Sequence, residues 1–393
     1  MKRHISFVLV IGIIMLTFLA ACAPKTTPVT SPNPIVNTPT ALAPTSTLSP
    51  VRQAQGEPPT SQDAAWAKVV EAAKKEGKLT IYSYNLTGDI GIAIGRAFKE
   101  RYGIQIDIVT GRGAEFIQRL HAEQRMGGLV GDLNDGNPPN AKLMKEEGLT
   151  IGIADELPVL QERDVWVTDV LGLDPKDKQI ISFVFATYSL YINTNLVKPG
   201  EEPKVWKDVL NPKWKSKMAA VNPTSSAGLL NSFGPLLMEK VIDEAFLKAL
   251  YLQDLRFSFN LPDEAGILSR GERSISLSGI NTVYSQFITQ GASIRAIELS
   301  DGTVLTPTVM VAFKGAAHPN ATKVFINWFL SPEGQTVWAK TAGVASIRKD
   351  VPNFLPEAAR LTPKRPVITT SEDTEEAARL YKEQWLNKLW GRQ

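Results

Sequence analysis

Hydrophobic residues recur along most of the chain at two alternating spacings, one typical of helices and one typical of strands. Residues 64–76 have the helical spacing, with Ser61 or Asp63 as N-cap and Gly77 after the last turn. Further helices are predicted over 89–102, 114–126, 139–147, 281–290, 320–330, 332–340 and 371–390, and from 228 toward 238. Strands are predicted over 78–84, 104–108, 180–193, 218–221, 274–278, 294–298 and 304–313, and a loop over 132–137. This alternation indicates an α/β fold whose ligands lie at the carboxyl ends of parallel strands.

Two of the predicted strands are unusually long. Residues 180–193 and 304–313 are rich in β-branched and aromatic side chains, which favour strands. After the N-terminal segments described next, about 330 residues remain, which is more than one compact core usually holds. We therefore predict two lobes, and strands of this length are suited to cross between them.

The N-terminus has the organisation of an export signal. Lys2 and Arg3 precede an apolar run over 5–19, which is too short for a comfortable membrane span. The run ends in Leu-Ala-Ala-Cys at 19–22, which resembles the lipobox of bacterial lipoproteins. That resemblance implies a signal peptide over 1–21 and a lipid attached to Cys22, the only cysteine of the chain. The alternative is an ordinary signal peptide with an incidental cysteine.

Residues 22–60 consist mainly of Pro, Thr, Ser and Ala, with few large apolar side chains. Such a segment buries too little surface to offset its chain entropy, and its prolines favour extended conformations. We interpret it as a tether between the anchor and the globular body. A tail without this task is the alternative.

Charge and composition exclude several classes of function. The net charge is +3 including Lys2 and Arg3, and no basic stripe suggests nucleic acid. Beyond the signal peptide the histidines are His121, which we expect on the surface, and His318, which we expect in a loop. With these two histidines and no free thiol we predict no zinc site, and we find no phosphate loop or nucleophile elbow. The prediction is a protein that is not an enzyme and has no cofactor.

Four segments, taken in their order and spacing, resemble family 1 extracellular solute-binding proteins, particularly the ferric-iron-type branch. They are WAKVVEAAKKEGKLTIYS at 66–83, TGRGAEFIQRLHAEQRMG at 110–127, NPKWKSKMAAVNPTSSAG at 211–228 and KGAAHPNATKVFINWFLSPEGQ at 314–335. The resemblance implies a two-lobed periplasmic-binding-protein fold of type 2 with two hinge crossings and a ligand between the lobes. It places the N-lobe at 77–184 and 308–342, and the C-lobe at 185–307 and 343–393.

The same resemblance implies the protein's role and partners. We expect a monomeric, lipid-anchored protein on the extracytoplasmic face of the cell membrane that delivers a solute to an ABC permease. A lipoprotein that presents a ligand to a sensory membrane kinase, and an enzyme on the same fold, are the alternatives. The absence of a nucleophile–base pair in the predicted loops argues against an enzyme.

The ligand set departs from the ferric-iron pattern that the resemblance implies. The first loop has no histidine, Asp135 is the only carboxylate near the expected glutamate, and Tyr284 is the one tyrosine that could remain of the expected pair. A hard ferric ion requires several anionic oxygen ligands, which these residues do not supply. The loop 224–227 before a predicted helix, in contrast, suits an anion. We therefore favour a small anionic or polar solute, with ferric iron as the alternative.

Candidate ligand-binding residues follow from these arguments. They are Tyr82, Tyr84, Asn85, Arg112, Asn137, Thr224, Ser225, Ser226, Ala227 and Tyr284. Arg112 suits a bidentate clamp on a carboxylate or phosphate, and the alternative is a solvated surface arginine. Tyr82 and Tyr84 alternate on one strand, so one is expected in the core and the other toward the ligand. For Tyr188 packing is the favoured interpretation, and a hinge position is the alternative.

Overall fold

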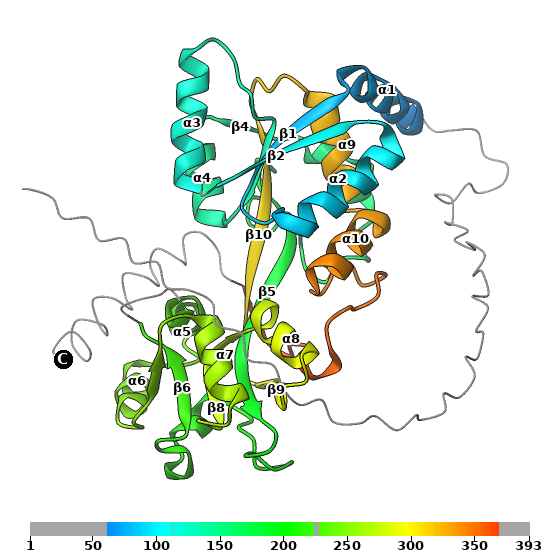
Figure 1. Cartoon of the computed structure of the whole chain (residues 1–393). Coiled ribbons are helices and arrows are strands. Elements are labelled where there is room, and N and C mark those ends of the chain that lie inside the picture. Colours follow the sequence, from blue (N-terminus) through cyan, green and yellow to red (C-terminus); the bar gives the residue numbers. More distant parts are fainter. Residues whose placement is uncertain (1–60, 112, 224–227, 369–393) are drawn as a thin grey trace, which may run out of the picture. The chain divides into compact units, whose positions relative to one another are not determined.

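The computed structural model describes residues 61–111, 113–223 and 228–368, so the predicted helix over 371–390 lies outside it (Figure 1). Within these ranges, 11 strands form one sheet in the order β2-β1-β3-β10-β5-β8-β6-β7, with β4 and β11 pairing with β10 and β9 with β5. The strands are β1 Lys78–Ser83, β2 Gln105–Thr110, β3 Leu133–Gly136, β4 Thr150–Ile151, β5 Ile181–Asn193, β6 Met218–Val221, β7 Arg256–Ser258, β8 Ile275–Ile280, β9 Ile294–Ile297, β10 Thr303–Phe313 and β11 Pro366–Ile368.

Ten α-helices cover this sheet in the described part of the chain. They are α1 Ser61–Glu76, α2 Gly88–Tyr102, α3 Gly113–Arg125, α4 Pro138–Glu146, α5 Gly228–Met238, α6 Glu244–Tyr251, α7 Leu261–Ser269, α8 Asn281–Thr289, α9 Pro319–Phe329 and α10 Pro332–Ala342. None of the helices described is both long and apolar enough to cross a membrane. The predicted α/β class is confirmed, and most predicted elements are found within one or two residues of their expected ends.

The long strands β5 and β10 pair with each other in antiparallel register, with Thr187 opposite Leu305. Figure 1 shows β1–β4, α1–α4, α9 and α10 around one end of this pair, which we call the β1 half. It shows β6–β9 and α5–α8 around the other end, which we call the β8 half. The buried hydrophobic clusters follow the same division. One end of the β5–β10 pair contributes side chains to the cluster of the β1 half, and the other end contributes to that of the β8 half.

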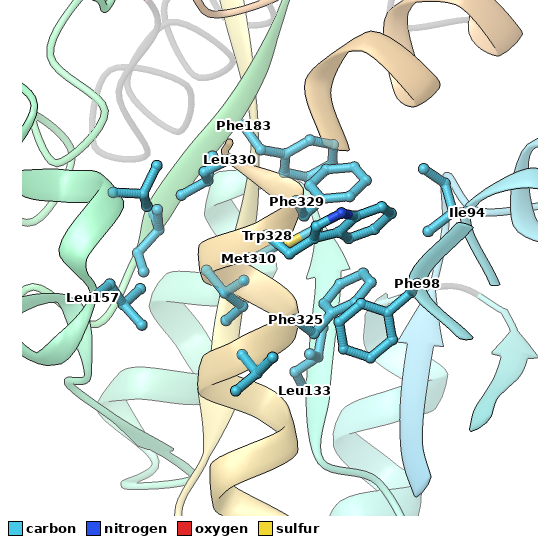
Figure 2. Close-up of a cluster of buried hydrophobic side chains, with 14 of the residues drawn as sticks. Ile94, Phe98, Leu133, Leu157, Phe183, Met310, Phe325, Trp328, Phe329 and Leu330 are labelled. Atoms are coloured by element: carbon cyan, nitrogen blue, oxygen red, sulfur yellow. The ribbon is translucent and has the colours of Figure 1, made fainter. Parts of the chain in front are cut away.

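Aromatic rings dominate the main hydrophobic cluster of the β1 half (Figure 2). Trp328 on α9 lies 5.3 Å from the ring of Phe98 on α2, and Phe329 lies 5.3 Å from Phe183 on β5, both between centroids. All four side chains are almost fully buried. Trp328 thus lies in the core, and its cluster packs α9 and α2 against the sheet.

Strand β3 corrects the loop that the sequence predicts over 132–137. Residues 133–136 pair in parallel with β1 and in antiparallel register with β10, and all four are buried. Their sequence, Leu-Asn-Asp-Gly, lacks the apolar alternation of a strand. The segment is a buried strand because Asn134 and Asp135 find polar partners in the interior, which periodicity does not reveal.

Helices α6 and α7 are absent from the sequence prediction, although both carry start signals. Asp243 accepts a hydrogen bond from the backbone N–H of Phe246, and Asn260 accepts one from that of Asp263. These are N-caps at the positions where capping residues are preferred. Pro235 lies within α5, which continues for three residues beyond it.

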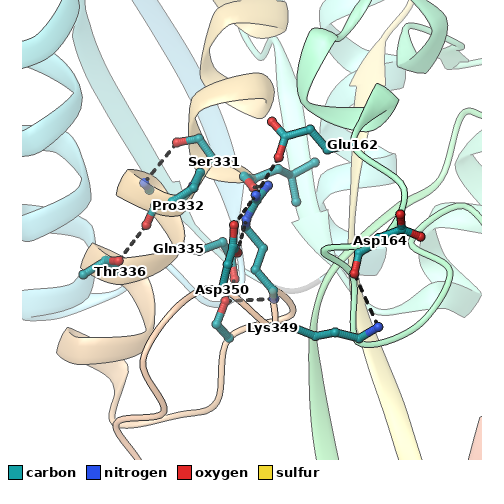
Figure 3. Close-up of polar contacts among 12 residues, drawn as sticks. Glu162, Asp164, Ser331, Pro332, Gln335, Thr336, Lys349 and Asp350 are labelled. Atoms are coloured by element: carbon teal, nitrogen blue, oxygen red, sulfur yellow. Dashed lines mark hydrogen bonds and ion pairs between the residues drawn. The ribbon is translucent and has the colours of Figure 1, made fainter. Parts of the chain in front are cut away.

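The segment after α10 is attached to the β1 half by a buried arginine. Arg348 is 2% exposed, and its guanidinium contacts Glu162 at 2.6 Å and Asp350 at 2.8 Å. Figure 3 shows Glu162 and Asp350 beside the first turn of α10. Since Val344 and Ile347 also belong to the Trp328 cluster, residues 344–350 pack with the β1 half, whereas the resemblance assigns 343–393 to the C-lobe.

Candidate functional site

Three parallel strand ends meet at one edge of the β1 half. β1 pairs in parallel with β2 and β3, so that Ser83 lies opposite both Thr110 and Asp135. The carboxyl ends of parallel strands are where α/β proteins bind ligands. The loops that leave this edge begin at Tyr84 and at Asn137.

Asp135 organises the loop after β1. Its Oδ1 accepts hydrogen bonds from the backbone N–H of Tyr84 at 3.0 Å, from that of Asn85 at 3.0 Å and from Asn85 Nδ2 at 2.8 Å. Its Oδ2 accepts from the hydroxyl of Ser83, which itself accepts from the backbone N–H of Leu86 at 2.7 Å. Burial raises the pKa of Asp135, although the hydrogen bonds from Ser83 and Asn85 oppose the shift. Both carboxylate oxygens are occupied, so Asp135 anchors the loop.

This anchoring presents two predicted ligand residues at the edge. Tyr84 is 63% exposed, and Asn85 is half-buried with its backbone fixed by Asp135. Asn137 is exposed, but its side chain accepts from the backbone N–H of Asn140 and caps α4. Of these three side chains, that of Tyr84 is the most open to a solute.

Tyr82 and Tyr284 lie in the core. Tyr82 is fully buried, stacks on Phe116 at 5.1 Å and donates its hydroxyl to Glu123. Tyr284 is fully buried, stacks on Tyr191 at 4.2 Å and donates to Ser276 at 2.6 Å. Both hydroxyls are already used in internal hydrogen bonds. The site proposed below therefore excludes these two residues.

A second polar edge lies in the β8 half, where β6 and β8 run in parallel toward the same edge. Asn281, directly after β8, accepts at Oδ1 from the backbone N–H of Thr187 on β5 at 3.1 Å. Asn231 on α5 donates to the hydroxyl of Tyr188 at 3.2 Å. Sequence reasoning missed Asn231 and Thr187, although Thr187 is a polar residue in the middle of a long apolar strand.

Groups on both edges influence the pKa of Tyr188. Burial raises this pKa, the hydrogen bond from Asn231 opposes the shift, and the electrostatic influence of Tyr84 raises it further. Tyr84 and Tyr188 thus belong to different halves but lie within electrostatic range of each other. Together with Asn85 and Asn231 they form a set of neutral hydrogen-bonding groups, which we call the Tyr84–Tyr188 set.

Several predicted site residues lie outside the described part of the chain. They are Cys22, Arg112, Thr224, Ser225, Ser226 and Ala227. Gly113, next to Arg112, begins α3 in close contact with α4: a Cβ built there would lie 1.8 Å from Asn140 Nδ2.

Within the described ranges, no three His, Cys, Asp or Glu side chains are placed to hold a metal ion. His318 is half-buried at the start of α9, where its Nδ1 lies 2.9 Å from Asp132. His121 lies on the surface as expected, with its Nε2 2.6 Å from Glu147. Each histidine thus contacts one carboxylate.

A family model described as bacterial extracellular solute-binding protein matches residues 93–366. The chain belongs to this family of extracellular solute-binding proteins. An uncharacterized protein of Haemophilus influenzae is 24% identical over 283 residues, which cover 69% of this chain and 78% of that one.

Solved structures show the same fold at low sequence identity. Iron-bound HitA from Pseudomonas aeruginosa has a TM-score of 0.58 at 21% identity, over 78% of this chain and 98% of that one. AfuA from Actinobacillus pleuropneumoniae with fructose-6-phosphate bound has a TM-score of 0.57 at 19% identity, over 80% and 98%. The Trichodesmium protein IdiA (FutA), in complex with iron and citrate, has 0.62 at 18% identity, over 79% and 99%.

These matches confirm the predicted family and the type 2 periplasmic-binding-protein fold. The chain is an extracellular solute-binding protein, which places it on the extracytoplasmic side of the membrane. AfuA, one of the structural neighbours, is a periplasmic binding protein.

Proposed function

We propose that this solute-binding protein captures a small anionic or polar solute at the Tyr84–Tyr188 set and delivers it to its ABC permease. Two features carry the proposal: a fixed loop on one half and a polar edge on the other. Asp135 fixes Tyr84 and Asn85 on one half, and Asn231 and Tyr188 form a hydrogen-bonded pair on the other. Preorganised donors of this kind bind a polar solute without the cost of ordering a loop.

Positive charge for an anion would come from residues that follow β2 and precede α5. Arg112 follows β2 by two residues, and the residues 224–227 immediately precede α5. A guanidinium and the first N–H groups of a helix both favour anions. The proposed site therefore consists of Tyr84, Asn85, Arg112, Asn137 and residues 224–227, with Tyr188 and Asn231 added from the structure.

Ferric iron is the second candidate, because iron-bound proteins are among the structural neighbours. AfuA with fructose-6-phosphate bound is about as similar in structure to this chain as iron-bound HitA, so the fold does not distinguish the two classes of ligand. The donor set favours the anion. Asp135 uses both oxygens on its own loop, and the hydroxyls of Tyr82 and Tyr284 are bonded in the core.

Binding would also close two lobes around the solute. We propose hinges near 185–188 and 305–309, where β5 and β10 pass from one half to the other. The N-lobe would comprise 77–184 and 308–342 and would extend to Asp350, because Arg348 and its neighbours pack with the β1 half. Rigid-body closure about two strands is a common response to ligands in binding proteins.

A thermal-shift screen of the full chain tests the solute class. We expect fructose 6-phosphate, citrate or inorganic phosphate at millimolar concentration to raise the melting temperature, because a ligand that binds only the folded state stabilises it by mass action. Spermidine, a cation, serves as the control of opposite charge. A shift with ferric ion alone, and none with the three anions, would select the iron alternative.

We further propose that Cys22 carries a lipid and that residues 22–60 tether the body to the membrane. Cys22→Ser should release the protein from the membrane fraction into the soluble fraction, because acyl chains anchor by burying their methylene groups. Immunoblots of fractions after high-salt and carbonate washing measure this release. Retention of the serine variant in washed membranes would contradict the anchor.

A further inference from the structure

One face of β8 is polar although the strand is buried. Ile275 and Leu277 pack into the hydrophobic cluster of the β8 half, together with Met218 of β6. Ser276 and Ser278 alternate with them and are 0% exposed. A buried hydroxyl costs free energy unless it finds a hydrogen-bond partner, so these serines require one.

Their partner is Glu264 on α7, which is also 0% exposed. Ser276 donates to Oε1 at 2.6 Å and Ser278 donates to Oε2 at 2.6 Å. Each serine oxygen also accepts a hydrogen bond: Ser276 accepts from the Tyr284 hydroxyl at 2.6 Å, and Ser278 accepts from the Val221 backbone N–H at 3.0 Å. A hydroxyl has one proton to donate, so each serine forms one arm of a network: it accepts a hydrogen bond from one group and donates its proton to the Glu264 carboxylate.

The arm through Ser278 reaches a functionally important position. Val221 is the last residue of β6, and the N–H of Asn222, which follows it, donates to Ser258 of β7. β6 and β8 are parallel, so the end of β6 lies at the same edge as Asn281. The arm through Ser276 instead reaches Tyr284 inside the core.

The buried environment of Glu264 shifts its ionisation toward neutral pH. Burial raises the pKa of Glu264 to about 7, although the hydrogen bonds from Ser276 and Ser278 lower it. On α7 itself and the elements packed against it, the other ionisable groups are Tyr188 and Tyr191 on β5, Tyr284 on α8, Arg256 on β7, Asp263 on α7 and Arg270 at the C-cap of α7. Arg256 and Arg270 are exposed and both contact Glu272, whereas Tyr191 and Tyr284 stack on each other in the core.

We propose that Glu264 is a positioning residue that, through Ser278, fixes the end of β6 at the solute-binding edge. Only the effect of Glu264 on solute affinity rests on the proposed function. The position of the β6 end is a property of the free protein and is tested separately.

The two serines provide a matched pair of variants. Ser276→Ala and Ser278→Ala remove hydroxyls from the same face of one strand, but of the two hydroxyls only that of Ser278 accepts a hydrogen bond from β6. In hydrogen exchange on the full chain, we expect Ser278→Ala to speed exchange at the Val221 amide by about tenfold, the effect of one lost hydrogen bond. Ser276→Ala should leave it within about twofold. Equal effects of the two variants on the Val221 amide would overturn the proposal.

A pH profile separates the charge of Glu264 from its packing. The folded-state pKa lies above the ordinary value, so Glu264 contributes stability that is present at low pH and lost as pH rises through about 7. We expect the melting temperature of the wild type to fall relative to that of Glu264→Gln between about pH 5 and 8. Parallel profiles would show that Glu264 does not titrate in this range and would remove the pH dependence from the proposal.

Titration with fructose 6-phosphate connects the network to the solute. If the wild type binds it, Ser278→Ala should weaken binding by about tenfold and Ser276→Ala by less than about twofold. The two variants should differ because only the Ser278 hydroxyl accepts the hydrogen bond from the Val221 amide. Equal affinities would refute the effect on the solute. If the wild type binds no anion, the proposed function fails, and the exchange experiment alone decides the role of Glu264.

Discussion

Trp328→Ala should lower the free energy of unfolding by about 3–5 kcal/mol, the range for truncating a large aromatic side chain in a core. Trp328 is 1% exposed and contacts the rings of Phe98 at 5.3 Å and Phe325 at 6.1 Å. Truncation leaves a cavity between α9 and α2 that these rings cannot fill without losing their own packing. Urea unfolding followed by circular dichroism measures the change.

Two substitutions serve as controls for this prediction. Trp328→Phe keeps most of the buried volume and should cost less than the alanine variant. Trp66→Ala removes the same residue type from α1, where the side chain is only partly buried, and should also cost less. If Trp328→Ala and Trp66→Ala destabilise equally, the Trp328 cluster is not the main core of the β1 half.

Asp135→Ala should both destabilise the protein by about 2–3 kcal/mol and abolish the proposed solute binding. The substitution leaves Ser83 and the backbone N–H groups of Tyr84 and Asn85 without their acceptor. The loop would then lose the fixed conformation in which Tyr84 is presented. Chemical unfolding measures the first effect and calorimetric titration measures the second.

Asp135→Asn separates these effects, because one amide oxygen can still accept from Tyr84 and Asn85. We expect an intermediate loss of affinity with a smaller loss of stability. Asp107→Ala, at an exposed position of β2, should change neither. Full affinity in Asp135→Ala would show that the loop after β1 does not contact the solute.

The sequence predicts the order of elements well because most of them have an apolar face. Residues 181–193 and 303–313 were recognisable as long strands from their β-branched composition, and they do connect the two halves. β3 was not recognisable, because Asn134 and Asp135 are buried through polar contacts made with residues about 50 positions away. Periodicity reports solvent exposure along one segment and contains no information about such partners.

The candidate site was predicted less well than the fold. Alternation placed Tyr82 and Tyr84 on different sides of β1 but did not reveal which side is the core. Tyr284 was aligned with a ligand position, whereas the structure gives it a buried partner in Ser276. The roles of Asp135 and Glu264 depend on tertiary hydrogen bonds, which no local sequence pattern encodes.

The most direct test of the central claim is calorimetric titration of the full chain with fructose 6-phosphate, citrate and inorganic phosphate, followed by mass spectrometry of the recovered solute. We expect saturable binding of at least one of these anions, with the solute recovered unchanged. We also expect Tyr84→Ala combined with Asn85→Ala to weaken binding by about tenfold or more without a matching loss of melting temperature. Chemical conversion of the solute, or an affinity that the double variant leaves unchanged, would contradict capture at the Tyr84–Tyr188 set.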